Sequence, residues 1–339
     1  MRSTLERFRR EAECQRLARL LACDTAELDF LAHLDIGELR LLRLAARDCL
    51  AQSQRPLLQR AVQASRLLPA ALIARIGENT LGPLLCARFS DFMSQPHLTS
   101  ICRHLSPAFM AEVGLHLDVD KLCEMALSLP PATIRALTRE VLQRREYILL
   151  GEVLERLPPA LLRHVAREFT EGEPYLRTMF FVESPARRQE IVELLPEGVL
   201  LDSMRAVARS PEALLPQALS LTLEVSPAWQ RRMMLYTLES GDSLLADMVA
   251  GIVRLELWGI ALPLVQRFTP EEIARLMRLP AWHDPDVLET LLKGGARQAL
   301  RPWVEVMLAQ LPPELAAPAR ARLAAMDQAA SPPGAGPGA

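Results

Sequence analysis

Two stretches of the sequence, 28 residues apart, match each other along their whole length. Leu129–Val141 reads LPPATIRALTREV, and Leu157–Phe169 reads LPPALLRHVAREF. Both space their apolar residues with the period of an α-helix rather than with the alternation of a half-buried strand. A proline in the first turn of a helix loses no hydrogen bond, because the amide that it replaces has no partner there. The two stretches therefore predict equivalent helices of an internal repeat.

The same helix start recurs along the chain. Ser, Thr or Pro is followed by Pro and then by Ala or Glu, with the second-position proline at Pro107, Pro131, Pro159, Pro185, Pro211, Pro227, Pro270 and Pro313. The first five are 24, 28, 26 and 26 residues apart, and then the spacing loosens to 16, 43 and 43 residues. A unit of about 26 residues holds two short helices and two turns. We expect an all-α fold, an α-solenoid of short helix pairs with proline at the helix starts.

The apolar residues of the matching stretches predict the core of this repeat. We expect both sets to be buried between neighbouring units: Ile134, Leu137, Val141, Leu162, Val165 and Phe169.

The beginning and the end of the chain differ from the repeat. Asp24 and Asp35 are each followed three residues later by Glu and then by an apolar run, which is the pattern of a capping box. We expect an N-terminal helical segment at 1–55 that ends in a joint at 52–56, and the helical-repeat solenoid at 56–325. Residues 326–339 are rich in Pro, Gly and Ala and predict a flexible tail.

Composition narrows the classes of partner. Half of the residues are hydrophobic, 24% are charged and the formal net charge is −2. A net charge this small sets up no long-range field to concentrate nucleic acid or anionic lipid. We therefore expect no nucleic-acid binding. The longest uncharged apolar stretch, around Leu257–Val265, is too short to span a bilayer, so we expect no membrane insertion.

Cysteine and lysine usage predicts the cellular setting. The six cysteines have no CxxC spacing, and in a reducing compartment they would be small buried hydrophobes. The start of the chain has no apolar region typical of a secretory signal. Lys121 and Lys293 are the only lysines among 39 basic residues, which indicates a GC-rich bacterial genome. We expect a protein of the bacterial cytoplasm.

The repeating Leu-Pro-Pro units of Pro107–Glu212 resemble the helical superstructure in the cytoplasmic N-domain of the MgtE-type magnesium transporters. The resemblance covers about a third of the chain and is one of pattern. It implies a ligand- or magnesium-sensing regulatory domain. Transport does not carry over, since we expect no membrane domain. None of the family's metal-binding residues carries over either, because no acidic motif matches.

Candidate metal sites are weak. His97, Cys102, His104 and His116 cluster in sequence but lack the spacing of zinc ligands, which favours structural roles. Asp118, Asp120 and Glu124 could form a weak magnesium site. We favour Asp120 as the N-cap of a helix, with Asp118 in the approach. We predict no metal and no cofactor.

Catalytic motifs are equally weak. The sequence has no Gly-x-Ser-x-Gly elbow and no protease-type cysteine signature, and its glycines do not cluster before a helix as a phosphate-binding loop requires. We predict a protein that is not an enzyme. An enzyme with a noncanonical site remains an alternative.

Four arginines form the candidate binding site. Arg135 and Arg163 lie four residues after a helix-starting proline, and Arg139 and Arg167 lie eight residues after it. Side chains at i and i+4 share a helix face, so stacked repeats would align the four guanidinium groups. Such a surface would bind an acidic segment of a protein partner. The alternative is a solvated face neutralised by Glu140, Glu155 and Glu168.

These features favour a non-catalytic protein-binding or scaffold module. A stack of helix pairs leaves an extended surface that commonly recognises a partner. The alternatives are the ligand- or magnesium-sensing domain and the noncanonical enzyme.

Overall fold

The computed structural model of the chain describes residues 2–295 and 300–330, and every regular element in these ranges is helical. The chain divides into two compact units. Unit 1 comprises Met1–Thr170 and Arg177–Leu195, and unit 2 comprises Glu171–Leu176 and Pro196–Ala339. Of the helices described, none is both long enough and apolar enough to cross a bilayer.

The helices of unit 1 are, in chain order, α1 (Arg2–Leu21), η1 (Thr25–Leu31), α2 (Ile36–Ser65), α3 (Ala70–Ile76), η2 (Gly77–Leu81), α4 (Gly82–Ser90), α5 (Gln95–Cys102), α6 (Pro107–Gly114), α7 (Val119–Ser128), α8 (Pro131–Gln143), α9 (Tyr147–Arg156), α10 (Pro159–Ala166) and α12 (Pro185–Leu194). The division between the units falls within α11 (Gly172–Met179).

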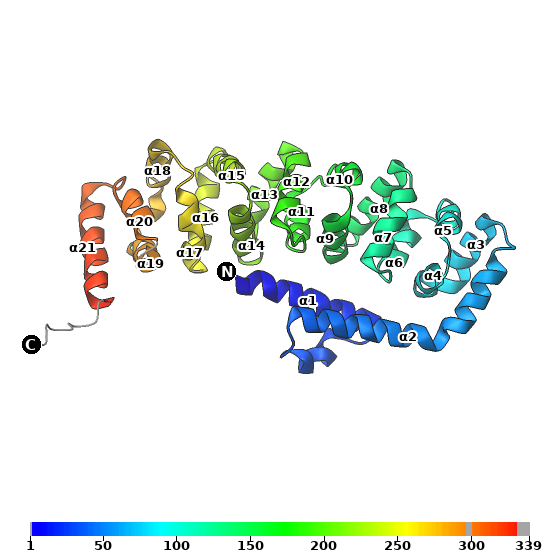
Figure 1. Cartoon of the computed structure of the whole chain (residues 1–339). Coiled ribbons are helices and arrows are strands. Elements are labelled where there is room, and N and C mark those ends of the chain that lie inside the picture. The colour runs from blue at the N-terminus through cyan, green and yellow to red at the C-terminus, as the bar shows by residue number, and fades with distance from the viewer. Residues whose placement is uncertain (1, 296–299, 331–339) are drawn as a thin grey trace, which may run out of the picture. The chain divides into compact units, whose positions relative to one another are not determined.

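The helices of unit 2 are α13 (Glu197–Arg209), α14 (Pro211–Glu224), α15 (Pro227–Glu239), α16 (Asp242–Arg254), α17 (Trp258–Val265), α18 (Pro270–Leu276), η3 (Pro280–His283), α19 (Pro285–Gly295), α20 (Arg301–Leu308) and α21 (Pro313–Ala330). Figure 1 shows both sets of short helices.

The prediction for the eight prolines is confirmed. Each is the first residue of a helix: α6, α8, α10, α12, α14, α15, α18 or α21. The residue before the proline completes several of these starts. The Ser106 hydroxyl accepts a hydrogen bond from the Phe109 amide at 3.2 Å, and the Thr269 side chain forms a full capping box with Glu272. A local rule of helix initiation therefore operates in both units.

The helices of unit 1 pack in two rows. Helices α4, α6, α8, α10 and α12 each contact the next in that series, and α3, α5, α7 and α9 form a second series of the same kind. Each proline-initiated helix of this region thus packs on the one before and the one after, two elements away in the chain. The repeat length of 24 to 28 residues corresponds to one helix from each row.

The predicted core is confirmed in part. Leu162, Val165, Phe169 and Ile134 are buried. Leu137 and Val141 are only half-buried, although they lie on the same apolar face of α8 as Ile134. Both line a cavity, described below, and this cavity leaves part of each side chain uncovered.

The N-terminal hairpin, which consists of α1, η1 and α2, has a core of its own. Both predicted capping boxes are present, at Asp24 with Glu27 and at Asp35 with Glu38. Helices α1 and α2 pack on each other. Together with η1 they bury five apolar side chains, those of Leu17, Ala18, Leu28, Leu31 and Leu39.

Two predictions about chain breaks need correction. The joint predicted at 52–56 is wrong, because α2 continues through it with Pro56 inside the helix. Figure 1 shows α2 changing direction along its length, as a helix with an internal proline does. The tail predicted at 326–339 is helical as far as Ala330, and residues 331–339 lie outside the described residues. The domain ranges stay predictions.

Two tryptophans lie in the core of unit 2. Trp282 is fully buried and lies 6.0 Å, centroid to centroid, from Trp258. Each indole N–H has a partner: Trp282 donates to the Leu276 carbonyl at 2.7 Å, and Trp258 donates to the Thr290 hydroxyl at 3.1 Å. Gly294, on α19, packs so closely on Trp258 that a Cβ atom would overlap with the tryptophan side chain.

Candidate functional site

Two successive proline-initiated helices carry the four candidate arginines. Arg135 and Arg139 lie one turn apart on α8, and their side chains are 45% and 59% exposed. Arg163 lies on α10 and Arg167 is its C-cap residue, and both are exposed. Since α8 and α10 are neighbours in the same row, the two arginine pairs lie on adjacent helices of that row. We call Arg135, Arg139, Arg163 and Arg167 the arginine surface.

One carboxylate links the two helices. Glu168 directly follows Arg167, and its side chain is only 11% exposed. Its two oxygens lie 2.5 Å from the Arg139 Nε and 4.0 Å from the Arg135 Nε. Because the two arginine side chains are themselves largely exposed, a ligand carboxylate can reach these guanidinium groups and compete with Glu168 for them.

The other two glutamates that could neutralise this surface have different partners. Glu140 pairs with Arg144 at 2.5 Å. The Glu155 carboxylate accepts hydrogen bonds from the amides of Glu183 and Ser184 at 2.8 and 3.1 Å, just before α12 begins. Of the three glutamates considered, Glu168 is therefore the one that pairs with the arginine surface.

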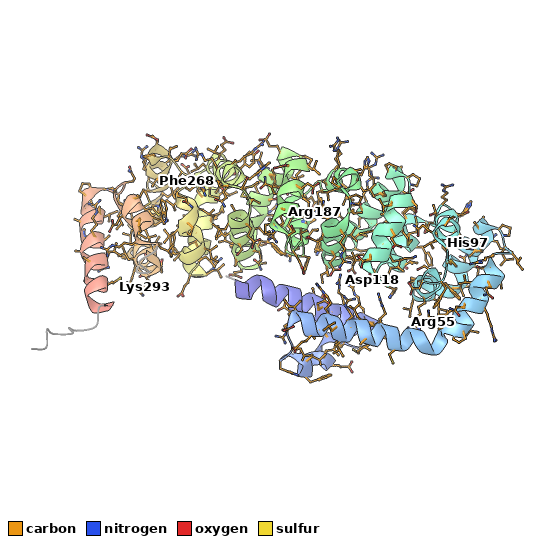
Figure 2. All side chains as sticks on the ribbon, viewed as in Figure 1. Arg55, His97, Asp118, Arg187, Phe268 and Lys293 are labelled. Carbon is orange, nitrogen blue, oxygen red and sulfur yellow. The ribbon has the colours of Figure 1, made fainter. Side chains whose placement is uncertain are left out.

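The acidic residues at the start of α7 correct a prediction. Asp118, rather than Asp120, is the N-cap residue, and it accepts a hydrogen bond from the Asp120 amide at 3.0 Å. The second Asp118 oxygen pairs with Arg47 of α2 at 2.7 Å, and Figure 2 shows Asp118 on the side of α7 that faces α2. The Asp120 side chain pairs with Arg156. Within the described ranges, no three His, Cys, Asp or Glu side chains are placed to hold a metal ion.

Ion pairs join the N-terminal hairpin to the helix rows of unit 1, and sequence reasoning missed them. Arginines of α1 and α2 pair with acidic residues at or near α7, α9 and α12: Arg16 with Glu152, Arg19 with Glu146 at 2.8 Å, Arg40 with Glu183 at 3.2 Å, and Arg47 with Asp118 at 2.7 Å. The four arginines, with Asp118 and Glu152, line a cleft of about 220 Å³. The partners are more than 70 residues apart in the chain, so no local pattern indicates them.

Glu13 is the buried centre of this network. Its carboxylate is 3% exposed and lies 2.9 Å from Arg43, 3.3 Å from Arg40 and 3.5 Å from Arg16. Burial lowers the pKa of Arg16 to about 10, although the Glu13 charge opposes this effect. Three guanidinium groups around one carboxylate hold α1 and α2 together as a charged layer beside their apolar core.

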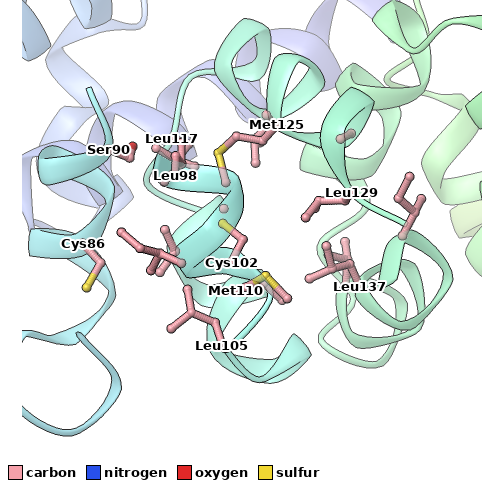
Figure 3. Close-up of a pocket in the computed structure, with 18 of the residues that line it drawn as sticks. Cys86, Ser90, Leu98, Cys102, Leu105, Met110, Leu117, Met125, Leu129 and Leu137 are labelled. Carbon is pink, nitrogen blue, oxygen red and sulfur yellow. The ribbon is translucent and has the colours of Figure 1, made fainter. Parts of the chain in front are cut away.

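An apolar cavity of about 160 Å³ lies between the two helix rows of unit 1 (Figure 3). Its walls come from α3 to α10 and include Leu98, Cys102 and Leu129, together with Met110 and Met125. Sequence reasoning expected a filled core at this place. The small residues that leave the space, such as Gly114 and Ala126, carry no signal when they are read one helix at a time.

A scan against models of protein families gives no match for this chain, and neither do searches among curated proteins and among solved structures. The described residues define its class as an all-helical protein of short, often proline-initiated helices. The resemblance to the MgtE-type N-domain stays a prediction, and no conclusion below rests on it.

Proposed function

We propose that the chain is a non-catalytic binding or scaffold module, an α-solenoid that binds an acidic segment of a protein partner. The row packing of α4, α6, α8, α10 and α12 supports this proposal, because each helix repeats the environment of the one before. Stacked helix pairs of this kind offer extended surfaces on which side chains recur at regular intervals.

The observation that carries the proposal is the arginine surface. Residues one helical turn apart are separated by about 6 Å along the helix, and alternate side chains of an extended peptide by about 6.6 Å. A segment with an acidic residue at every second position would therefore match Arg135 with Arg139, or Arg163 with Arg167. Arginine is suited to this task because its planar guanidinium group donates two parallel hydrogen bonds to one carboxylate.

The cysteines support a cytoplasmic module. All six are free thiols, and two of them, Cys102 and Cys123, are buried. Free buried thiols are typical of proteins in a reducing compartment.

An acidic peptide tests the proposed site directly. We expect fluorescein-labelled octaglutamate to bind in a fluorescence anisotropy titration, and its affinity to fall as NaCl rises from about 50 to about 300 mM, because exposed charges are screened. The double variant Arg139→Glu/Arg167→Glu should weaken binding about tenfold or more, which is at least about 1.4 kcal/mol. Unchanged binding in this variant would reject the site.

A matched control has the same change of charge elsewhere. Arg205 and Arg278 are exposed residues of unit 2, and Arg205→Glu/Arg278→Glu should bind octaglutamate almost as wild type does. Equal loss in both double variants would mean that net charge, and not the arginine surface, attracts the peptide. Co-purification from the native cells with each variant then tests the natural partner, which should be absent from the Arg139/Arg167 variant alone.

A further inference from the structure

The apolar cavity of unit 1 has walls that almost entirely lack available polar groups. Two hydroxyls contribute to its lining, and both are satisfied within their own helix: Ser90 donates to the Ala87 carbonyl at 2.6 Å, and Thr138 donates to the Ile134 carbonyl at 2.9 Å. The thiols of Cys86 and Cys102 also line the cavity, and burial raises the pKa of each to about 11. They are therefore neutral at physiological pH.

A water molecule would form few hydrogen bonds in such a space. A buried water molecule needs about two to four polar partners, and apolar cavities of this size stay dry. An apolar molecule, in contrast, would form dispersion contacts with side chains that now face empty space. The chemistry of the walls therefore selects a hydrocarbon and rejects a polar ligand.

The size and shape of the cavity further restrict the class of ligand. An engineered apolar cavity of about 150 Å³ in another protein takes up benzene, so about 160 Å³ accommodates a ligand of similar bulk. The lining extends over successive helix pairs, from Ile73 on α3 to Val165 on α10, which favours a chain over a compact ring. Figure 3 shows Met110 and Met125 among the wall residues, and methionine adapts readily to the outline of a ligand.

The cavity also has access to solvent. The space is not fully enclosed, and Leu105, Leu137 and Val141 of its wall are half-buried. A ligand with a polar end could leave that end outside while its hydrocarbon part occupies the cavity.

We propose that unit 1 binds a short hydrocarbon chain in this cavity, such as the alkyl part of a medium-chain fatty acid or alcohol. This inference is independent of the arginine surface. Its consequence is that the helix rows of unit 1 are stabilised by the ligand, because binding to the folded state alone shifts unfolding by mass action.

Thermal unfolding with 1-octanol, octanoate and toluene tests the proposal. We expect 1-octanol to raise the Tm of the chain saturably at concentrations too low for a solvent effect, and toluene to raise it less. Octanoate should act like 1-octanol, because its carboxylate can stay outside the cavity. Absence of any Tm increase with all three probes would overturn the proposal.

Variants that fill the cavity provide the second arm. At Gly114 an added Cβ atom would meet only the Leu122 Cδ2, at 3.4 Å, so Gly114→Leu and Ala126→Leu should occupy the space and abolish the Tm response to 1-octanol. Ala132→Leu is the matched control, since Ala132 is exposed on α8 and does not line the cavity. An undiminished response in the filled variants would overturn the proposal.

Protection of thiols from alkylation in the wild-type chain tests binding in the cavity if the filled variants do not fold. We expect 1-octanol to slow alkylation of Cys102, which lines the cavity, and to leave alkylation of the exposed Cys49 unchanged. Equal rates at Cys102 with and without 1-octanol would count against binding in this cavity.

Discussion

The two units start their helices by the same chemistry but fill the space between the helices differently. In unit 2, Trp282 is fully buried against Trp258, and α19 approaches closely enough that Gly294 has no room for a side chain. In unit 1, Leu137 and Val141 point into a cavity of about 160 Å³. Similar helix starts therefore do not imply similar cores, because a proline start is a local property and packing depends on residues from several helices.

The sequence supplies a separate probe for each unit. All four tryptophans, Trp229, Trp258, Trp282 and Trp303, lie in unit 2, and all six cysteines lie between Cys14 and Cys123 in unit 1. Tryptophan fluorescence thus follows the packed unit and thiol reactivity follows the unit with the cavity, within one unmodified chain.

Truncation of a core side chain should show the largest difference in unfolding free energy between the two units. Trp282→Ala removes a fully buried indole and should lower the free energy of unfolding by about 3–5 kcal/mol. Leu137→Ala enlarges a space that already exists and removes a half-buried side chain, so it should cost less than about 2 kcal/mol. Urea denaturation measures both. A Leu137→Ala effect as large as that of Trp282→Ala would show that the cavity is filled in solution.

Alkaline pH should weaken unit 1 through its buried thiols. Burial raises the pKa of Cys102 from 9.0 to about 11, so the unfolded chain loses its proton first and folding stability falls as the pH rises from 9 to 11. The full effect for this buried thiol is on the order of 3 kcal/mol. Urea denaturation at intervals over this range should give a shallower decline for Cys102→Ala. An identical decline in both proteins would assign the loss to other groups.

A glycine-to-alanine substitution should have opposite effects on the free energy of unfolding in the two units. Gly294→Ala would force a methyl group into Trp258 and should destabilise the chain by about 1–3 kcal/mol. Gly114→Ala would place the methyl group beside the cavity and should stabilise by up to about 1 kcal/mol, because alanine favours helix over glycine. Thermal unfolding compares the two. Destabilisation by both would contradict the difference in packing.

The smallest effect on stability is expected at the arginine surface. Arg139→Glu/Arg167→Glu should change the free energy of unfolding by less than about 0.5 kcal/mol, because both side chains are exposed. Circular dichroism melting beside Arg205→Glu/Arg278→Glu checks this expectation. A large loss in the first variant alone would make the pair of Arg139 with Glu168 a structural contact.

Local signals in the sequence predict where the helices start but say little about how the helices pack. The prolines and the capping boxes at Asp24 and Asp35 act through neighbouring backbone amides, so their residue patterns suffice. The prediction of a joint at 52–56 was wrong because α2 tolerates Pro56 within a long helix. The N-cap residue of α7 is Asp118 and not the predicted Asp120. The local pattern could not separate the two, because either aspartate fits it.

The candidate site was predictable only along single helices. The i and i+4 spacing placed Arg135 with Arg139 on one face of α8, and both are exposed. That Glu168 reaches back from the end of α10 to both arginines depends on how the helices pack. The ion pairs of the N-terminal hairpin and the cavity of unit 1 likewise arise from residues far apart in the chain, where one sequence carries no pattern to find.

The ion pairs of the N-terminal hairpin impose an order on synthesis. Arg19 leaves the ribosome 127 residues before its partner Glu146, and Arg40 leaves it 143 residues before Glu183. At about 5–20 residues per second, Arg19 waits about 6–25 s for its partner Glu146. The hairpin core around Leu17 and Leu39 can form during this interval, because all of its members have already been made. A nascent chain stalled before residue 146 should therefore expose a folded basic hairpin that the finished protein covers with its own acidic residues.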